Sequence, residues 1–134
     1  MVGILIVAHG AFGEVLIHCA SHVLGKRPLR VRQVGVTVHD DPDAILPQAR
    51  ELVRQLDEGD GVLVLTDMIG ATPSNIAARL AVPGRVEVVG GVSLPMLIRA
   101  LTYRAQPLDA VVDKAISGGR EGVMHLEAHA ATGS

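Results

Sequence analysis

Apolar residues follow two alternating patterns along this chain. Two short segments, 2–8 and 61–66, are continuously apolar, which is typical of strands covered on both faces. Residues 31–38 have Val34, Val36 and Val38 in alternation, and 86–90 is another short segment rich in valine. Longer segments between and after them have apolar residues three or four positions apart, which predicts helices. The predicted strands are 2–8, 31–38, 61–66 and 86–90, and the predicted helices are 11–24, 42–59, a short one that ends at 80, 94–103 and 108–116.

The order of these elements predicts the fold class. Strands that alternate with helices are joined by right-handed crossovers and form parallel sheets. We therefore expect an α/β fold with a mainly parallel central sheet and helices on both faces. After Gly118 and Gly119, residues 122–127 are predicted to form a last, antiparallel edge strand. Residues 1–127 are then one domain, and 128–134 a disordered tail.

The composition argues against nucleic-acid binding, an internal disulfide and a membrane span. The chain has 134 residues, 12 basic against 14 acidic, and a net charge of -2, so no phosphate backbone of a nucleic acid is expected as a partner. The single cysteine, Cys19, excludes an internal disulfide and fits a reducing compartment, so we expect the cytoplasm. No apolar run approaches the length of about 18 residues that suggests a membrane span.

Two polar residues stand directly after predicted strands. His9 follows the first strand and Asp67 follows the third. In open α/β sheets, ligands bind beyond the carboxyl ends of the strands, and adjacent parallel strands would bring these two side chains within hydrogen-bond reach. A carboxylate bonded to one ring nitrogen leaves the other as a nucleophile. The alternative is a histidine with a purely structural role.

The loop after Asp67 supplies a possible anion site. Gly70 permits a tight turn, Thr72 offers a hydroxyl, and Pro73 fits the first position of a helix. Free amides at a helix start stabilise anions such as phosphoryl groups. Such turns also occur where they only cap a helix, and that alternative remains open.

Other common sites are absent from the sequence. There is no Gly-x-x-x-x-Gly-Lys-Ser/Thr loop and no Gly-x-Gly-x-x-Gly after the first strand, and Ser74 lacks the Gly-x-Ser-x-Gly setting of a hydrolase. His18 and His22 are four residues apart on one helix face, a spacing that could hold a metal but more often marks a solvated face. We predict no metal site.

Four sequence blocks together resemble a known family. They are Ile-Val-Ala-His-Gly at 6–10, Leu-Thr-Asp-Met-Ile-Gly-Ala-Thr-Pro-Ser-Asn at 65–75, Gly-Gly-Val-Ser-Leu-Pro-Met-Leu at 90–97 and Gly-Arg-Glu-Gly-Val at 119–123. In this order and spacing they are similar to the mannose-type enzyme IIA domain of the bacterial phosphoenolpyruvate-dependent sugar phosphotransferase system. The resemblance covers residues 2–127.

The resemblance implies a role for each site residue. His9 would accept a phosphoryl group on Nε2 from the phosphocarrier HPr and pass it to an enzyme IIB, while Asp67 holds Nδ1-H. Thr72, with backbone amides near Gly70 and Ala71, would bind the phosphoryl oxygens. The family needs no metal or organic cofactor, serves the membrane subunits IIC and IID indirectly, and is typically a homodimer, often with the last strand exchanged.

Some features leave alternatives open. Ala71 stands where the family more often has glycine, which puts a positive φ there in doubt. A regulatory module phosphorylated at His9, or a domain that only binds an anion, would share the same residues. The apolar residues Met68, Ile69, Pro95 and Met96 are candidates for partner docking, with ordinary core packing as the alternative.

Overall fold

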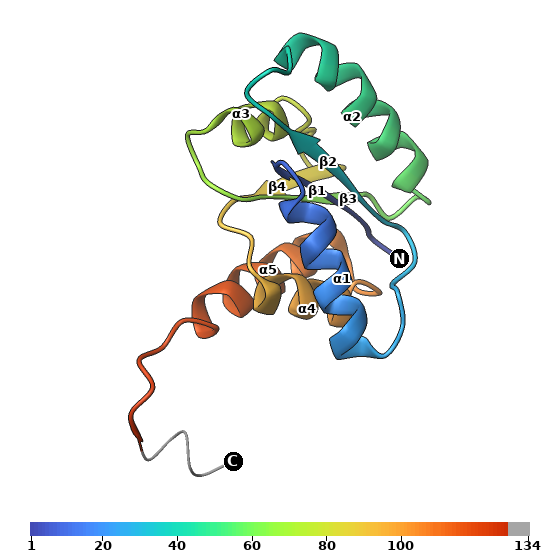
Figure 1. Cartoon of the computed structure of the whole chain (residues 1–134). Helices are drawn as coiled ribbons and strands as arrows, with labels where there is room; N and C mark the ends of the chain where they lie inside the picture. The colour runs from blue at the N-terminus through green and yellow to red at the C-terminus, as the bar shows by residue number, and fades with distance from the viewer. Residues whose placement is uncertain (129–134) are drawn as a thin grey trace.

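The computed structural model describes residues 1–128 and shows a four-stranded parallel sheet between two layers of helices (Figure 1). The sheet order is β2-β1-β3-β4, so β1 lies in the interior of the sheet and β4 at one edge. This confirms the predicted α/β class. The elements are β1 (Gly3–His9), α1 (Phe12–Leu24), β2 (Val31–Val36), α2 (Pro42–Leu56), β3 (Val62–Thr66), α3 (Thr72–Ala78), β4 (Val86–Val89), α4 (Leu94–Tyr103) and α5 (Leu108–Glu121).

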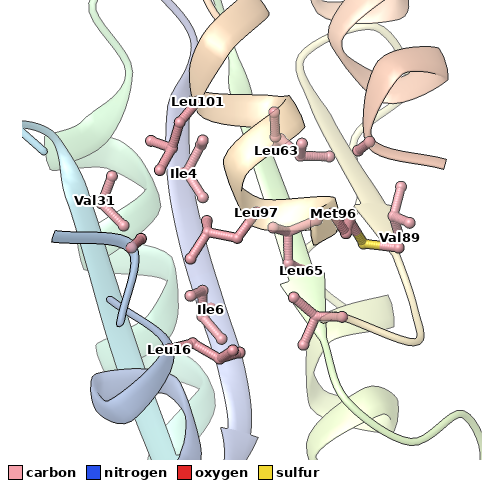
Figure 2. Packing of buried hydrophobic residues seen from close by; sticks show 14 of the residues in the cluster. Ile4, Ile6, Leu16, Val31, Leu63, Leu65, Val89, Met96, Leu97 and Leu101 are labelled. Carbon is pink, nitrogen blue, oxygen red and sulfur yellow. The ribbon is translucent and has the colours of Figure 1, made fainter. Parts of the chain in front are cut away.

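Alternate residues of the central strand face two separate cores. Ile4 and Ile6 belong to the core under α1, α4 and α5, part of which is drawn in Figure 2. Leu5 and Val7 belong to the core under α2 and α3. Since side chains in a strand point to opposite faces in turn, a continuous apolar run is what two covered faces require. The central strands are thereby fixed rigidly between the helix layers.

The parallel register places the carboxyl ends of the strands at one edge. Val7 of β1 pairs with Thr66 of β3, and His9 pairs with Val36 of β2. The chain therefore leaves β1 and β3 at neighbouring points, directly before α1 and the loop into α3.

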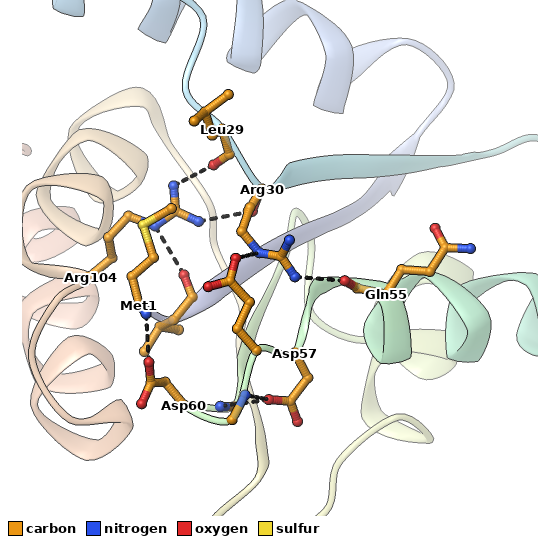
Figure 3. Close-up of polar contacts among 11 residues, drawn as sticks. Met1, Leu29, Arg30, Gln55, Asp57, Asp60 and Arg104 are labelled. Atoms are coloured by element: carbon orange, nitrogen blue, oxygen red, sulfur yellow. Dashed lines mark hydrogen bonds and ion pairs between the residues drawn. The ribbon is translucent and has the colours of Figure 1, made fainter.

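A buried arginine closes the opposite end of the sheet (Figure 3). The Arg104 side chain follows α4, is 7% exposed, and donates to three backbone carbonyls, those of Val2 at 3.0 Å, Leu29 at 2.6 Å and Arg30 at 2.9 Å. Burial and the nearby charge of Arg30 lower the pKa of the Arg104 guanidinium, and Glu58 acts in the other direction. The guanidinium joins α4 to the start of β1 and to the segment before β2.

The last helix is longer than predicted, because its two glycines serve helix packing. α5 continues through Gly118 and Gly119 to Glu121. A Cβ atom at Gly118 would lie 2.6 Å from Cβ of Arg99 on α4, and one at Gly119 would lie 2.7 Å from Cε of Met96. These glycines let α4 and α5 approach closely, so they do not end the helix.

The predicted last strand does not form within the single chain. In the described residues no strand follows β4, and the antiparallel edge strand predicted at 122–127 is therefore wrong for one isolated copy. The Gly122 amide still donates to the Gly118 carbonyl, after which the chain runs away from the body (Figure 1). A strand without a neighbour has no ladder to join. Residues 129–134 of the predicted tail lie outside the described residues.

Candidate functional site

His9 is the first exposed residue at the end of a fully buried strand. The six residues of β1 before it are all buried, while its own side chain is 51% exposed. The next residue, Gly10, has φ of +51° and donates its amide to the Val36 carbonyl at 2.9 Å. A Cβ atom at Gly35 of β2 would lie 2.2 Å from the Gly10 carbonyl oxygen, so Gly35 makes this close turn possible. The imidazole is thus held at the rim of the sheet.

Asp67 fixes both the backbone and the ring of His9. Its Oδ2 atom accepts from the His9 backbone amide at 2.9 Å and lies 2.7 Å from Nδ1 of the same residue. Its Oδ1 atom accepts from the Met68 amide at 2.8 Å. The Asp67 side chain is 14% exposed. Hydrogen bonds from Met68 in its own loop and from His9 of β1 therefore set the position of the Asp67 carboxylate.

The environment favours the ionised form of Asp67. Partial burial raises the pKa of this carboxyl, but the hydrogen bonds from His9 and Met68 outweigh burial and leave the pKa below its ordinary value. An ionised carboxylate can only accept hydrogen bonds, so the Nδ1 atom of His9 carries the proton. In the neutral ring the Nε2 atom then keeps its lone pair. The pair presents an oriented, half-exposed nucleophile.

The loop after β4 holds the backbone of Asp67 and of Thr66 before it. The Gly91 amide donates to the Asp67 carbonyl at 2.8 Å, and the Val92 amide donates to the Thr66 carbonyl at 2.9 Å. A Cβ atom at Gly90 would lie 2.5 Å from Cγ1 of Ile69, so Gly90 makes room for the loop that follows Asp67. The glycine pair was visible in the sequence, but its contact with this loop depends on the fold.

The loop before α3 is occupied by its own hydrogen bonds. The Gly70 amide donates to Oγ of Ser74 at 2.9 Å, and the Ser74 hydroxyl donates to the Ala71 carbonyl at 2.9 Å. The Ala71 amide donates to the Met68 carbonyl at 3.3 Å. Gly70 has φ of +92°, whereas Ala71 is extended with φ of -89°. Sequence reasoning missed Ser74 because a bond from residue 74 back to residue 70 has no distinctive motif.

Thr72 is the loop residue with a free side chain. It is exposed, begins α3, and among the described residues its hydroxyl has no hydrogen-bond partner. The structure therefore brings His9 and Asp67 into direct contact, and Thr72 begins the helix that follows the loop after Asp67. The internal hydrogen bonding at residues 70 and 71 was not expected.

The candidate docking residues separate into two groups. Met68 and Ile69 beside the site are 63% and 78% exposed, while Met96 is 4% exposed and belongs to the core of α1, α4 and α5. Met96 is therefore a packing residue, and its candidacy for docking is wrong. Pro95 is exposed but lies on α4 against α5.

Residues 1–128 contain neither a cluster of three or more metal ligands nor a membrane-spanning helix. In that part of the chain no group of three or more His, Cys, Asp or Glu side chains is arranged to hold a metal ion. Among the same residues, none of the helices has the length and apolar character needed to cross a membrane.

Known proteins share this sequence pattern and fold. The chain is 32% identical over 130 residues to the PTS system mannose-specific EIIAB component of Escherichia coli K12, and this alignment covers 95% of the chain and 40% of that protein. It is also 32% identical over 111 residues to the transcriptional regulatory protein LevR of Bacillus subtilis, and that alignment covers 82% of the chain and 11% of LevR. The chain thus spans well under half the length of these relatives.

A solved structure gives the same picture. The phosphotransferase system component EIIA from Streptococcus agalactiae matches with a TM-score of 0.82 and 27% identity, over 93% of this chain and 97% of that one. Residues 3–116 also match the family model EIIA-man, described as the PTS system fructose IIA component. The chain therefore belongs to the EIIA-man family of phosphotransferase-system IIA components.

Proposed function

We propose that this chain is a phosphocarrier whose His9 accepts a phosphoryl group from HPr and passes it to an enzyme IIB. The observation that carries the proposal is the 2.7 Å contact between Nδ1 of His9 and Oδ2 of Asp67, in a ring that is half exposed. This contact orients the ring and keeps the lone pair on Nε2, where a partner protein can reach it.

The transfer needs no further reactant. The lone pair on Nε2 attacks the phosphorus of phosphorylated HPr, a nitrogen–phosphorus bond forms on His9, and the bond from phosphorus to its donor group on HPr breaks. The proton on Nδ1 stays in place throughout, facing Asp67. Phosphoryl transfer passes through a loose transition state and depends mostly on positioning and charge stabilisation, which a small rigid site can supply. On transfer to enzyme IIB, His9 is the donor: the nitrogen–phosphorus bond on His9 breaks as a new bond forms on enzyme IIB.

Thr72 is the strongest candidate for contact with the phosphoryl oxygens. Its hydroxyl has no partner in the described residues, whereas the Gly70 and Ala71 amides already donate within the loop. These two amides would contribute after the loop adjusts or by sharing their hydrogen bonds. No metal or organic cofactor is needed for this role.

Exposed apolar residues beside the site suit protein partners. Met68 and Ile69 directly follow Asp67 and are largely exposed. Apolar side chains around a polar centre are common at protein interfaces. We assign them to the surface that HPr and enzyme IIB cover in turn. In this role residues 1–127 act as one IIA domain in the cytoplasm, with IIC and IID membrane subunits downstream.

A homodimer completes the proposal. β4 is an open edge of the sheet, and the segment after α5 exposes three apolar side chains, those of Val123, Met124 and Leu126. An open edge and an unpaired apolar segment in the same molecule can pair between two copies.

Light scattering on a size-exclusion column tests this dimer. It should give twice the chain mass for the full chain and the monomer mass after truncation at Glu121. A monomeric full chain would contradict pairing of the last segment with the partner's sheet.

The direct test is phosphorylation in a purified system. The full chain is incubated with phosphoenolpyruvate, enzyme I and HPr, and intact-protein and peptide mass spectrometry then locate any phosphoryl group. We expect one acid-labile phosphoryl group, on His9, that depends on HPr. If the chain acquires none while HPr is phosphorylated, the phosphocarrier proposal fails and a domain that only binds anions remains.

A regulatory role is the second candidate, and the similarity to LevR favours it. LevR is named as a transcriptional regulatory protein, and the matched part is 11% of its length. In a regulator, His9 would be phosphorylated in the same way but the phosphoryl group would go no further. Transfer from the phosphorylated chain to the enzyme IIB of the same genome distinguishes the two roles, because a carrier loses its phosphoryl group to enzyme IIB and a regulator keeps it.

A further inference from the structure

Two histidines on α1 lie together, away from the site described above. His18 and His22 are one helical turn apart, and both are exposed. Their Nε2 atoms are 3.3 Å apart, their ring centroids are 4.8 Å apart, and the ring planes are nearly perpendicular, at 89°. The four-residue spacing alone is also typical of a solvated helix face. The short distance between the two Nε2 atoms is what distinguishes this pair.

The separation of the nitrogens fits one metal ion. Zinc binds imidazole nitrogen at about 2.0–2.1 Å in tetrahedral geometry, which places two such nitrogens about 3.3–3.4 Å apart. The observed 3.3 Å matches this value. It lies beyond the range of about 2.7–3.2 Å usual for hydrogen bonds donated by N–H. Ligation through both Nε2 atoms needs only that each ring carry its proton on Nδ1.

Among residues 1–128, each of the two rings has only the other ring as a polar partner. In the described part of the chain no carboxylate pairs with either ring; Glu14, one turn earlier on α1, is paired with Arg27 at 3.0 Å. His22 lies in the last turn of α1, which ends at Leu24. The carbonyl end of a helix carries partial negative charge and favours a cation.

We propose that His18 and His22 form a surface site for a divalent ion of the nickel, copper and zinc series, with water in the remaining positions. Imidazole suits these ions, and the usual order of affinity places copper highest. A bound ion would link two turns of α1 and stabilise the folded chain. The proposal is independent of the role of His9.

The first test uses the untagged full chain with zinc and nickel salts. Titration calorimetry measures affinity, and nitrogen-15 NMR of the histidine rings with zinc identifies the ligands. We expect one ion per chain, with the Nε2 signals of His18 and His22 shifting together at one equivalent while those of His39 and His125 stay in place. Signals that do not shift together would overturn the proposal, and this measurement needs no variant to fold.

Matched variants provide the second test. Loss of groups that merely support a metal ligand already costs about 10–100-fold in affinity, so H18N or H22N should weaken nickel binding at least tenfold. The variants H39N and H125N remove other imidazoles and should bind as the unmodified chain does. H22N combined with V23H keeps the number of imidazoles but breaks the four-residue spacing, and it should bind as weakly as H22N. Equal affinity in H22N and the unmodified chain would overturn the proposal.

Discussion

The two ends of the sheet hold their polar groups in opposite ways. At the amino-terminal end, Arg104 is buried and its guanidinium donates to three backbone carbonyls, so the charge is enclosed by its own chain. At the carboxyl end, Asp67 uses its hydrogen bonds to hold His9, whose ring remains half exposed. One cluster joins segments of the fold, and the other leaves one atom, Nε2 of His9, without a partner among the described residues.

This difference separates stability from function. A buried group whose bonds are all made within the chain contributes to folding and offers nothing to a partner. A group that is oriented but left open contributes little to folding and is available for chemistry. Substitutions at the two ends should therefore affect different measurements, and four predictions test that separation.

The largest expected effect is complete loss of phosphorylation in H9Q. Glutamine lacks the nucleophilic ring nitrogen, so no phosphoryl group should be incorporated from HPr. The free energy of unfolding should change by less than about 1 kcal/mol, because the lost side-chain hydrogen bond comes from a half-exposed ring. Mass spectrometry and urea unfolding measure the two quantities. H39Q, which alters an exposed histidine elsewhere, should be phosphorylated normally.

R104M should have the opposite profile. Methionine removes the guanidinium donor from three backbone carbonyls, of which, among the described residues, only that of Arg30 keeps another donor, the Ile4 amide. Hydrogen bonds to charged groups contribute about 1.5–3 kcal/mol each, so we expect a loss of at least about 3 kcal/mol in unfolding free energy. Urea unfolding measures it, with R104K expected to lie between because lysine keeps the charge but not the planar fork. Phosphorylation per folded molecule should be unchanged; a folded but inactive R104M would show that the two ends are coupled.

D67N should reduce the rate of phosphorylation more than stability. Asparagine is nearly isosteric but carries no charge to hold the proton on Nδ1 of His9. Loss of one preorganised polar group in an active site costs about 100–1,000-fold in rate, and we expect about 100-fold here. Rapid-quench transfer from phosphorylated HPr measures it. D60N, at the opposite end of the sheet, is the control and should transfer at the normal rate.

The smallest expected effect is a change of stability with pH. The pKa of Asp67 in the folded chain is below the value of about 3.9 for an unfolded aspartate, so its ionised form stabilises the fold above that value. This contribution is lost as pH falls through the folded-state pKa. The difference in unfolding free energy between the unmodified chain and D67N should be constant near neutral pH and shrink below about pH 4. A difference that grows in acid would contradict this assignment.

The sequence predicted those parts of the fold that depend on local pattern. Continuous or alternating apolar positions identified all four strands, and the placement of His9 and Asp67 after parallel strands predicted their contact. The second strand was predicted to reach Val38 but ends at Val36. There the Thr37 amide turns to bond the Asp40 carboxylate at 2.7 Å, and that bond competes with continuation of the sheet.

Features that depend on distant contacts could not be predicted. Glycine usually ends helices, so Gly118 suggested an end, yet its role depends on the approach of Arg99 from another helix. The three carbonyls bonded by Arg104 come from residues 74 to 102 positions away. The Ser74 bond to Gly70 likewise requires the folded loop.

The hydrogen bonds from Gly91 and Val92 to the backbone of Asp67 and Thr66 also bear on the order of folding. His9 and Asp67 are 58 positions apart, and the amides of Gly91 and Val92 that hold the loop come later still. Contacts between positions far apart form slowly, because chain closure must come first. During synthesis, the His9 imidazole is therefore made long before the groups that orient it. A nascent chain therefore completes the hydrogen bonds around Asp67 only after the segment that follows β4 has emerged and docked.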